Sequence, residues 1–245
     1  MSNIQGMKDM TEVMRLAAQS LAVWEEWNGI GVSARRTILA SWSDTVEQRG
    51  DAFVSAAKMI RFHLQQAETL LEPVHDMPGP TGETNELYTA GRGLFLITGD
   101  DGLSLTALSG QLTAALVAGN CALVAVPAAL RHDTDALLAD LVKTSVSDRL
   151  VPTIDLNHVD SALADAPLCG VAAVASDALL IEMNRTLAAR DGVLVQFVAE
   201  NNADLLPIVA SPTYLLRFIT ERTRTINITA VGGNATLLEL GSGEH

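Results

Sequence analysis

Short runs of residues that are apolar at nearly every position alternate with segments of helical periodicity between residues 93 and 199. The apolar runs are GLFLIT (93–98), CALVAV (121–126), VPTIDL (151–156), CGVAAVA (169–175) and VLVQFVA (193–199). The helical segments are residues 103–118, 133–145, 160–166 and 176–190. Strands that are apolar on both sides are covered on both faces, and strands that alternate with helices form right-handed βαβ units. We therefore expect an α/β fold with a parallel sheet flanked by helices.

The N-terminal part of the chain has a different pattern. Residues 8–72 are helical in periodicity throughout, with amphipathic segments at 8–28, 34–49 and 51–71. The Pro- and Gly-rich stretch EPVHDMPGPTGETN then predicts a connection with turns. We expect three parts, an N-terminal helical region (1–80), a Rossmann-like domain (81–210) and a helix followed by a C-terminal β-flap (211–245).

The C-terminal segment has the pattern of a β-hairpin. TRTINITA alternates polar and apolar residues, GGN supplies a turn, and ATLLEL is the expected return strand. An isolated hairpin is only marginally stable in water, so it either extends a sheet of its own chain or pairs with a partner subunit, and we favour the partner. The expected interface residues are Thr225, Ile226, Asn227, Ile228, Thr229, Gly232, Gly233, Asn234, Leu237 and Leu240.

Charge and composition exclude several classes of protein. The formal net charge is −13, and no cluster of Lys and Arg is present to bind nucleic acid. Residues 102–130 carry no charge, but a Gly-Asn pair and Pro127 interrupt them, which favours a buried helix, a turn and a strand over a membrane span. The start MSNIQGMKDM lacks a signal-peptide pattern, so we expect a cytoplasmic protein. The five histidines have no metal-site spacing, and we expect no metal.

The two cysteines, Cys121 and Cys169, both lie in apolar runs that are typical of strands. Their separation fits neither a zinc motif nor a disulfide framework. We therefore expect buried, unreactive thiols.

Several stretches, taken in their order, resemble aldehyde dehydrogenases and in particular the bacterial proline utilization A proteins. These stretches are PGPTGETNELYTAGRGLFL, SGQLTAALVAGNCALVAVPA, MNRTLAARDG, FVAEN and ERTRTINITAVGGNATLLEL. The resemblance implies a Rossmann-type NAD domain, a catalytic domain with a nucleophilic cysteine, and an oligomerisation flap. It also implies that active relatives oxidise glutamate semialdehyde to glutamate and reduce NAD.

The residues expected for catalysis are largely missing. Glu200, in FVAEN, matches the glutamate that serves as general base in the family, but no cysteine follows it. We interpret the segment NADLLPIVASPTYLLRFI as a direct connection from the sheet to the flap, with the catalytic domain of the family deleted. We therefore interpret Glu200 as a remnant, an acidic residue at a strand end, and expect no catalytic residue.

The NAD crevice also differs from the family pattern. Asp100 and Asp101 occupy the turn that holds an oxyanion-binding asparagine in the family, and Val126 replaces a lysine that binds the cofactor ribose. Ser176 and Asp177 replace a Gly-Ser turn under the pyrophosphate. Carboxylates at these positions cap the helices themselves and repel phosphate. We expect a blocked crevice and no cofactor, whereas active relatives bind NAD.

Together, these features predict a non-catalytic aldehyde-dehydrogenase-like domain with a structural role. The resemblance implies that it covers or pairs with the active glutamate-semialdehyde dehydrogenase domain of a proline utilization A protein and helps to close the channelling cavity. Self-association through the flap is a further option. Two alternatives remain, a shortened NAD-dependent L-glutamate γ-semialdehyde (1-pyrroline-5-carboxylate) dehydrogenase fragment of proline catabolism, and a small-molecule binding module.

Overall fold

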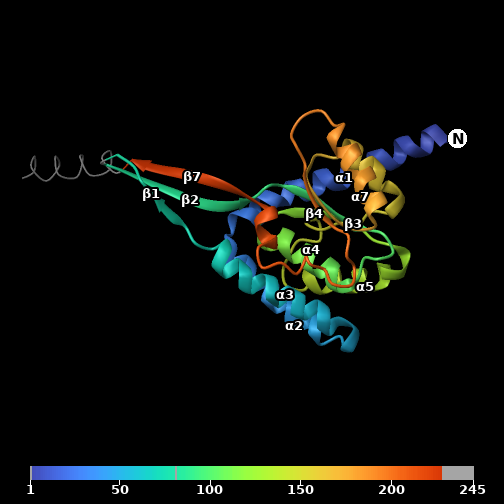
Figure 1. Ribbon diagram of the computed structural model, residues 1–245, viewed down its shortest axis with the longest axis horizontal. Coiled ribbons are helices and arrows are strands. Elements are labelled where there is room, and N and C mark those ends of the chain that lie inside the picture. Colours follow the sequence, from blue (N-terminus) through green and yellow to red (C-terminus); the bar gives the residue numbers. More distant parts are fainter. Residues whose placement is uncertain (1, 81, 228–245) are drawn as a thin grey trace, which may run out of the picture.

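The computed structural model describes residues 2–80 and 82–227. Within this part, a layered α/β body carries a long antiparallel sheet that projects from one end (Figure 1). We call this sheet, formed by β1, β2 and β7 (residues 75–77, 83–91 and 219–227), the ribbon. The fold class predicted from the sequence is confirmed. Whether the chain divides at residues 80 and 210 stays a prediction.

Three helices form the N-terminal region, α1 (Ser2–Gly29), α2 (Val32–Glu47) and α3 (Asp51–Leu70). The bounds of α2 and α3 lie within two residues of the predicted segments, because the turns before them contain Gly31 and Gly50, whose positive φ angles of 84° and 108° suit glycine. Helix α1 begins at Ser2, earlier than the predicted start at residue 8. Sequence periodicity and turn chemistry are both local signals, so this region was readable from the sequence.

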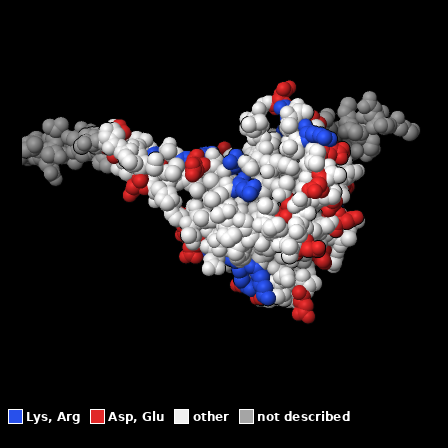
Figure 2. Space-filling view, in the orientation of Figure 1, with Lys and Arg blue, Asp and Glu red and all other residues white. Residues whose placement is uncertain are grey.

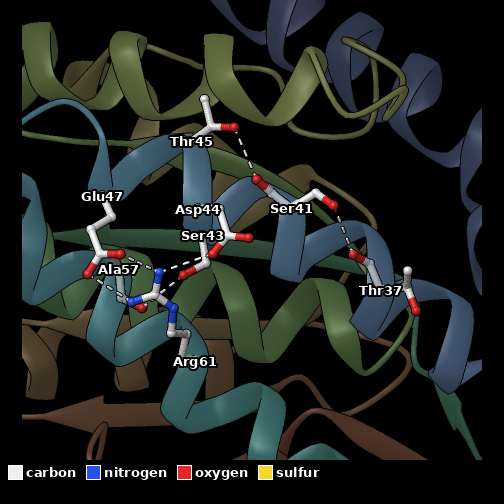
Figure 3. Close-up of polar contacts among 8 residues, drawn as sticks. All are labelled: Thr37, Ser41, Ser43, Asp44, Thr45, Glu47, Ala57 and Arg61. Carbon is white, nitrogen blue, oxygen red and sulfur yellow. Dashed lines mark hydrogen bonds and ion pairs between the residues drawn. The ribbon is translucent and has the colours of Figure 1, made fainter.

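Polar contacts tie α2 to α3 (Figure 3). Arg61 of α3 donates from Nη1 to Glu47 Oε1 at 2.9 Å and from Nη2 to Asp44 Oδ1 at 3.1 Å, both on α2. The buried Ser43 hydroxyl donates to the Ala57 carbonyl oxygen at 3.1 Å. These contacts join α2 and α3, and both helices pack against α4 (Leu105–Val117).

The parallel sheet has the order β4 (Cys121–Ala125), β3 (Leu94–Gly99), β5 (Leu168–Val174), β6 (Gln196–Glu200) in the described part of the chain. Its connections contain α4 (Leu105–Val117), α5 (Ala128–Val142), α6 (Val159–Asp165) and α7 (Asp177–Ala188). The connection from β3 to β4 and the connection from β5 to β6 cross the sheet in opposite directions. Because such connections are right-handed, α4 and α7 lie on opposite faces of the sheet (Figure 1). Helix α1 packs against β3 and β4, and α3 packs against α4.

The core lies between these layers. All residues of β3 and β4 are buried, and so is nearly all of α4, which α3 covers. Trp27 and Trp42 are buried, and their indole N–H groups donate to the carbonyl oxygens of Leu116 and Leu137 at 3.0 and 2.9 Å. The uncharged stretch is thus a buried helix, a turn and a strand, as predicted. Across the described residues, no helix is long and apolar enough to cross a membrane.

One predicted strand is absent. Residues 151–156 form only an isolated parallel bridge between Thr153 and Val124, and then enter a 3₁₀ helix (Leu156–His158). Pro152 has no N–H to donate to a ladder, which limits this segment to a few contacts with β4.

The ribbon corrects a second expectation. Residues predicted as a connection instead form β1 (His75–Met77) and the first three residues of β2 (Glu83–Gly91). Strand β7 (Ile219–Asn227) pairs antiparallel with all nine residues of β2, from Glu83 opposite Asn227 to Gly91 opposite Ile219. One edge of the C-terminal strand therefore extends a sheet within the chain. The predicted return strand at residues 235–240 lies outside the described residues.

Candidate functional site

The strand order creates a switch point between β3 and β5. The chain passes from β3 outward to β4 and then returns across β3 to β5 and β6. In open parallel sheets, ligands bind outside the carboxyl ends of the strands at such a point. Strand β3 ends at Gly99 and β5 ends at Val174, so the residues that follow them border the expected crevice.

The carboxylate of Asp100 lies at this switch point. Its Oδ2 accepts from the Ser176 amide at 2.7 Å, and its Oδ1 accepts from the Gly102 amide at 3.0 Å. The Asp100 amide donates in turn to the Val174 carbonyl oxygen at 3.2 Å. Burial raises the pKa of the Asp100 carboxyl, but the Ser176 and Gly102 amides outweigh it and leave the pKa below its ordinary value. Asp100 therefore joins the ends of β3 and β5 as a charged group.

The other crevice residues have different roles. Asp101 is exposed, whereas Val126 is buried at the end of β4. Asp177 begins α7, and its Oδ1 accepts from Asn201 Nδ2 at 2.9 Å. Asp100, Asp177 and Val126 therefore lie at the carboxyl edge of the sheet, and the carboxylates of Asp100 and Asp177 link neighbouring segments.

The expected helix capping by these aspartates is wrong. Helix α4 is capped by Ser104, whose Oγ accepts from the Ala107 amide at 3.2 Å. Helix α7 has Ser176 as its N-cap residue, without a capping bond from that side chain. The turn after β3 is long enough to place a serine at the helix start, which leaves Asp100 free to reach across to β5.

Glu200 is buried at the end of β6, with 1% of its surface exposed. Its Oε1 accepts from the Asn202 amide at 3.0 Å, and its Oε2 accepts from the Ile208 and Val209 amides at 2.6 and 3.2 Å. The carboxylate thus holds the loop that leads from the sheet toward the ribbon. A carboxylate engaged by three amides is poorly placed to take a proton from a substrate.

A group of buried polar side chains near the loop that follows β6 was not predicted from the sequence. His63, Gln111 and Tyr214 are fully buried, and the His63 nitrogens, the Gln111 amide and the Tyr214 hydroxyl have no hydrogen-bond partner among the described residues. The ring centres of His63 and Tyr214 are 5.4 Å apart. The helical spacing of His63 with Ile60 and Ala67 is the one sequence signal that could have placed it inside.

Burial shifts the pKa values of two members of this group, His63 and Tyr214. Burial lowers the pKa of His63 to about 4, and the nearby Val209 backbone opposes this only in part. Burial raises the pKa of Tyr214 well above its ordinary value, and the negative charge of Glu200 raises it further. His63 and Tyr214 are therefore both neutral at physiological pH.

The two cysteines lie at the other end of the sheet. Cys121 is the first residue of β4 and Cys169 the second residue of β5, so both are at the amino edge, opposite Glu200. Cys121 is buried as expected, and burial raises the pKa of its thiol to about 11. Cys169 is only half-buried, which corrects the expectation for that residue. Among the described residues, no group of three or more His, Cys, Asp or Glu side chains could hold a metal ion.

Three of the expected interface residues can be located. Thr225, Ile226 and Asn227 end β7, and their side chains are exposed on the ribbon. The Thr225 hydroxyl lies 2.5 Å from Asn85 Oδ1 on β2. The remaining expected interface residues, Ile228, Thr229, Gly232, Gly233, Asn234, Leu237 and Leu240, lie outside the described residues.

Comparisons with known proteins agree with this fold. A structure of proline utilization A from Bradyrhizobium japonicum superimposes with a TM-score of 0.71 at 25% identity, over 79% of this chain and 22% of that one. A structure of 3,6-anhydro-L-galactose dehydrogenase in complex with NAP superimposes with a TM-score of 0.65 at 14% identity, over 76% of this chain and 43% of that one. The chain thus has an aldehyde dehydrogenase-like fold.

A comparison of sequences identifies a more specific relative than the fold does. The bifunctional protein PutA of Rhizobium meliloti is 34% identical over 171 residues, which are 68% of this chain and 12% of that protein. No protein-family model matches the chain. The chain is related to proline utilization A, and it spans about an eighth of the length of this curated relative.

Proposed function

We propose that this chain is a non-catalytic aldehyde-dehydrogenase-like domain whose role is structural. It covers or pairs with the glutamate-semialdehyde dehydrogenase domain of a proline utilization A protein and helps to close the cavity through which the intermediate passes. The observation that carries the proposal is the Asp100 carboxylate, which binds the Ser176 amide at the switch point of the sheet.

Electrostatics oppose a dinucleotide at this position. The amides that would receive a pyrophosphate already serve Asp100, which carries a negative charge at neutral pH. Two like charges about 4 Å apart repel by about 4 kcal/mol at an effective dielectric constant near 20. A repulsion of this size corresponds to about a thousandfold loss of affinity.

In the described part of the chain, the groups that aldehyde oxidation needs are not brought together either. Aldehyde oxidation through a thiohemiacetal needs a thiolate near the base and the cofactor. The two thiols lie at the amino edge of the sheet, whereas Glu200 lies at the carboxyl edge and holds three loop amides. This separation supports a structural role over the alternative of a shortened dehydrogenase.

The ribbon is the part that we expect to contact the partner. It projects from the body (Figure 1), and β7 forms an edge of its sheet in the described part of the chain. Ile226 places an apolar side chain, 43% exposed, near its end. An edge strand with exposed apolar residues pairs readily with another sheet.

An association experiment tests this proposal. The chain is mixed with a proline utilization A protein that lacks its own C-terminal aldehyde-dehydrogenase-like domain, and the mass of the mixture is measured by size exclusion with light scattering. We expect a complex, and we expect the lag before NADH appears from proline to shorten when the complex forms. Ile226→Lys should weaken the complex at least tenfold, because it places a charge in the contact.

Leu194→Lys is the matched control, because Leu194 is 90% exposed on the loop before β6 and does not belong to the ribbon strands. It should leave the association unchanged. Absence of a complex at micromolar concentrations, or equal effects of the two substitutions, would contradict the proposed role of the ribbon.

A further inference from the structure

A groove lies where the ribbon meets the N-terminal helices, away from the carboxyl edge of the parallel sheet. The turn between α1 and α2, the end of α3 and the ribbon strands β2 and β7 line it, and its volume is about 520 Å³. We propose that this groove binds a small oxyanion, a carboxylate or a phosphate. The proposal is independent of the structural role proposed above.

The charge of the groove is opposite to that of the protein. The chain has a formal net charge of −13, and Figure 2 shows acidic side chains spread over the face in view. Yet three arginines line the groove, Arg35, Arg222 and Arg224. Its acidic lining residue is Glu72, which already accepts from Arg36 Nη1 at 2.5 Å. A concave cationic surface on an acidic protein concentrates anions locally.

Two of these arginines stand side by side on β7, on the same side of the ribbon as Tyr88. Arg224 donates from Nε to Glu86 at 2.9 Å and lies 5.8 Å from the centre of the Tyr88 ring, which holds its guanidinium in place. Arg222 is paired with Tyr88 across the strands, and its side chain has no hydrogen bond or ion pair to a described residue. A guanidinium with free donors suits the planar oxygens of a carboxylate or a phosphate.

Arg35 supplies a third positive charge from inside the protein. It is 1% exposed, and it donates from Nε to the Val117 carbonyl oxygen at 2.9 Å and from Nη1 to the Asn28 carbonyl oxygen at 2.7 Å. None of these described partners is a carboxylate. Burial lowers the pKa of Arg35 to about 10, so it keeps its charge at neutral pH. A buried charge without a counter-ion acts on an anion through a low dielectric.

The start of α2 completes the groove. Gly31 is its N-cap residue and gives no side-chain capping bond, and Val32 and Ser33 line the groove. The first amides of a helix and a nearby hydroxyl are suitable donors to an oxyanion. Because the first turn of α2 and three arginines border one volume, the site fits a ligand with several anionic oxygens.

Calorimetric titration at constant ionic strength tests the site, with citrate as the carboxylate probe, inorganic phosphate as the phosphate probe and glycerol as the neutral one. We expect saturable binding of citrate or phosphate and none of glycerol. Arg222→Gln should lower the affinity at least tenfold. Arg149→Gln removes the same charge from an exposed position outside the groove, and it should change the affinity less than twofold.

A second variant separates binding from folding. Ser33→Asp adds a negative charge in the first turn of α2, which favours the helix but repels an anion. It should keep or raise the melting temperature while it abolishes binding. Ile226→Lys should leave anion binding intact, so a failure of the ribbon proposal is distinguishable from a failure here. No saturable binding of either anion, or equal losses in Arg222→Gln and Arg149→Gln, would overturn the assignment.

Discussion

Glu200 shows how the sequence can place a residue without giving its contacts. A glutamate after an apolar strand is where the family places its general base, and Glu200 does end β6 at the carboxyl edge. Its oxygens, however, accept from three amides of the following loop. No sequence pattern reports this, because the amides of Ile208 and Val209 reach the carboxylate only after the loop has folded back.

The Glu200 contacts lead to a stability prediction. Glu200→Gln replaces one acceptor oxygen with a donor that faces amide N–H groups, and it should lower the free energy of unfolding by about 2–3 kcal/mol. Urea denaturation measures this change. Glu221→Gln, at an exposed position on β7, is the control and should change the stability by less than about 0.5 kcal/mol. A stable Glu200→Gln variant would indicate a free carboxylate.

His63 predicts a pH dependence. Its pKa is about 4 in the folded chain, against 6.5 ordinarily. Because the unfolded chain binds more protons between these values, stability falls as the pH falls from 6.5 toward 4. The expected loss from about pH 7.5 to about pH 5 is about 2 kcal/mol. Urea denaturation at both pH values measures it.

The variants for this test follow from burial. His63→Leu should remove the loss of stability between the two pH values, whatever it costs at neutral pH, whereas His132→Leu, at an exposed position on α5, should retain it. Equal pH dependence in the wild type and His63→Leu would rule out His63 as its source.

At the scale of elements, the helices were predictable and the pairing of the ribbon was not. Helix bounds follow from periodicity and from glycines at turns, which are local features. The pairing of β2 with β7 joins segments far apart in the sequence, and the polar residues of β2 carry no strong strand pattern. The predicted strand at 151–156 failed for a local reason, since Pro152 lacks the N–H group that a regular ladder with β4 needs.

The link between β3 and β5 gives an element-scale prediction. Asp100→Ala removes the acceptor for the Ser176 and Gly102 amides, so it should lower the free energy of unfolding by about 1–3 kcal/mol. Asp101→Ala changes the exposed neighbour and should have almost no effect. Thermal and urea unfolding of both variants measure the difference. Equal stabilities would show that Asp100 does not hold the strand ends together.

At the scale of the whole molecule, the charge at the carboxyl edge of the sheet determines whether the fold can bind a dinucleotide. We predict that NAD titrated to millimolar concentrations gives no saturable heat, because Asp100 occupies the switch point with a negative charge. An active aldehyde dehydrogenase under the same conditions is the positive control. Submillimolar binding of NAD would favour the alternative of a shortened dehydrogenase.

The sequence by itself determined the layered α/β class, the helix positions, four strands of the parallel sheet and the acidic residues at its carboxyl edge. These features depend on periodicity and residue chemistry, which involve residues close together in the sequence. The tertiary structure alone decided which groups those acids contact, how the ribbon forms and where an arginine-lined groove lies. These features depend on backbone amides and side chains that meet only when distant segments pack together.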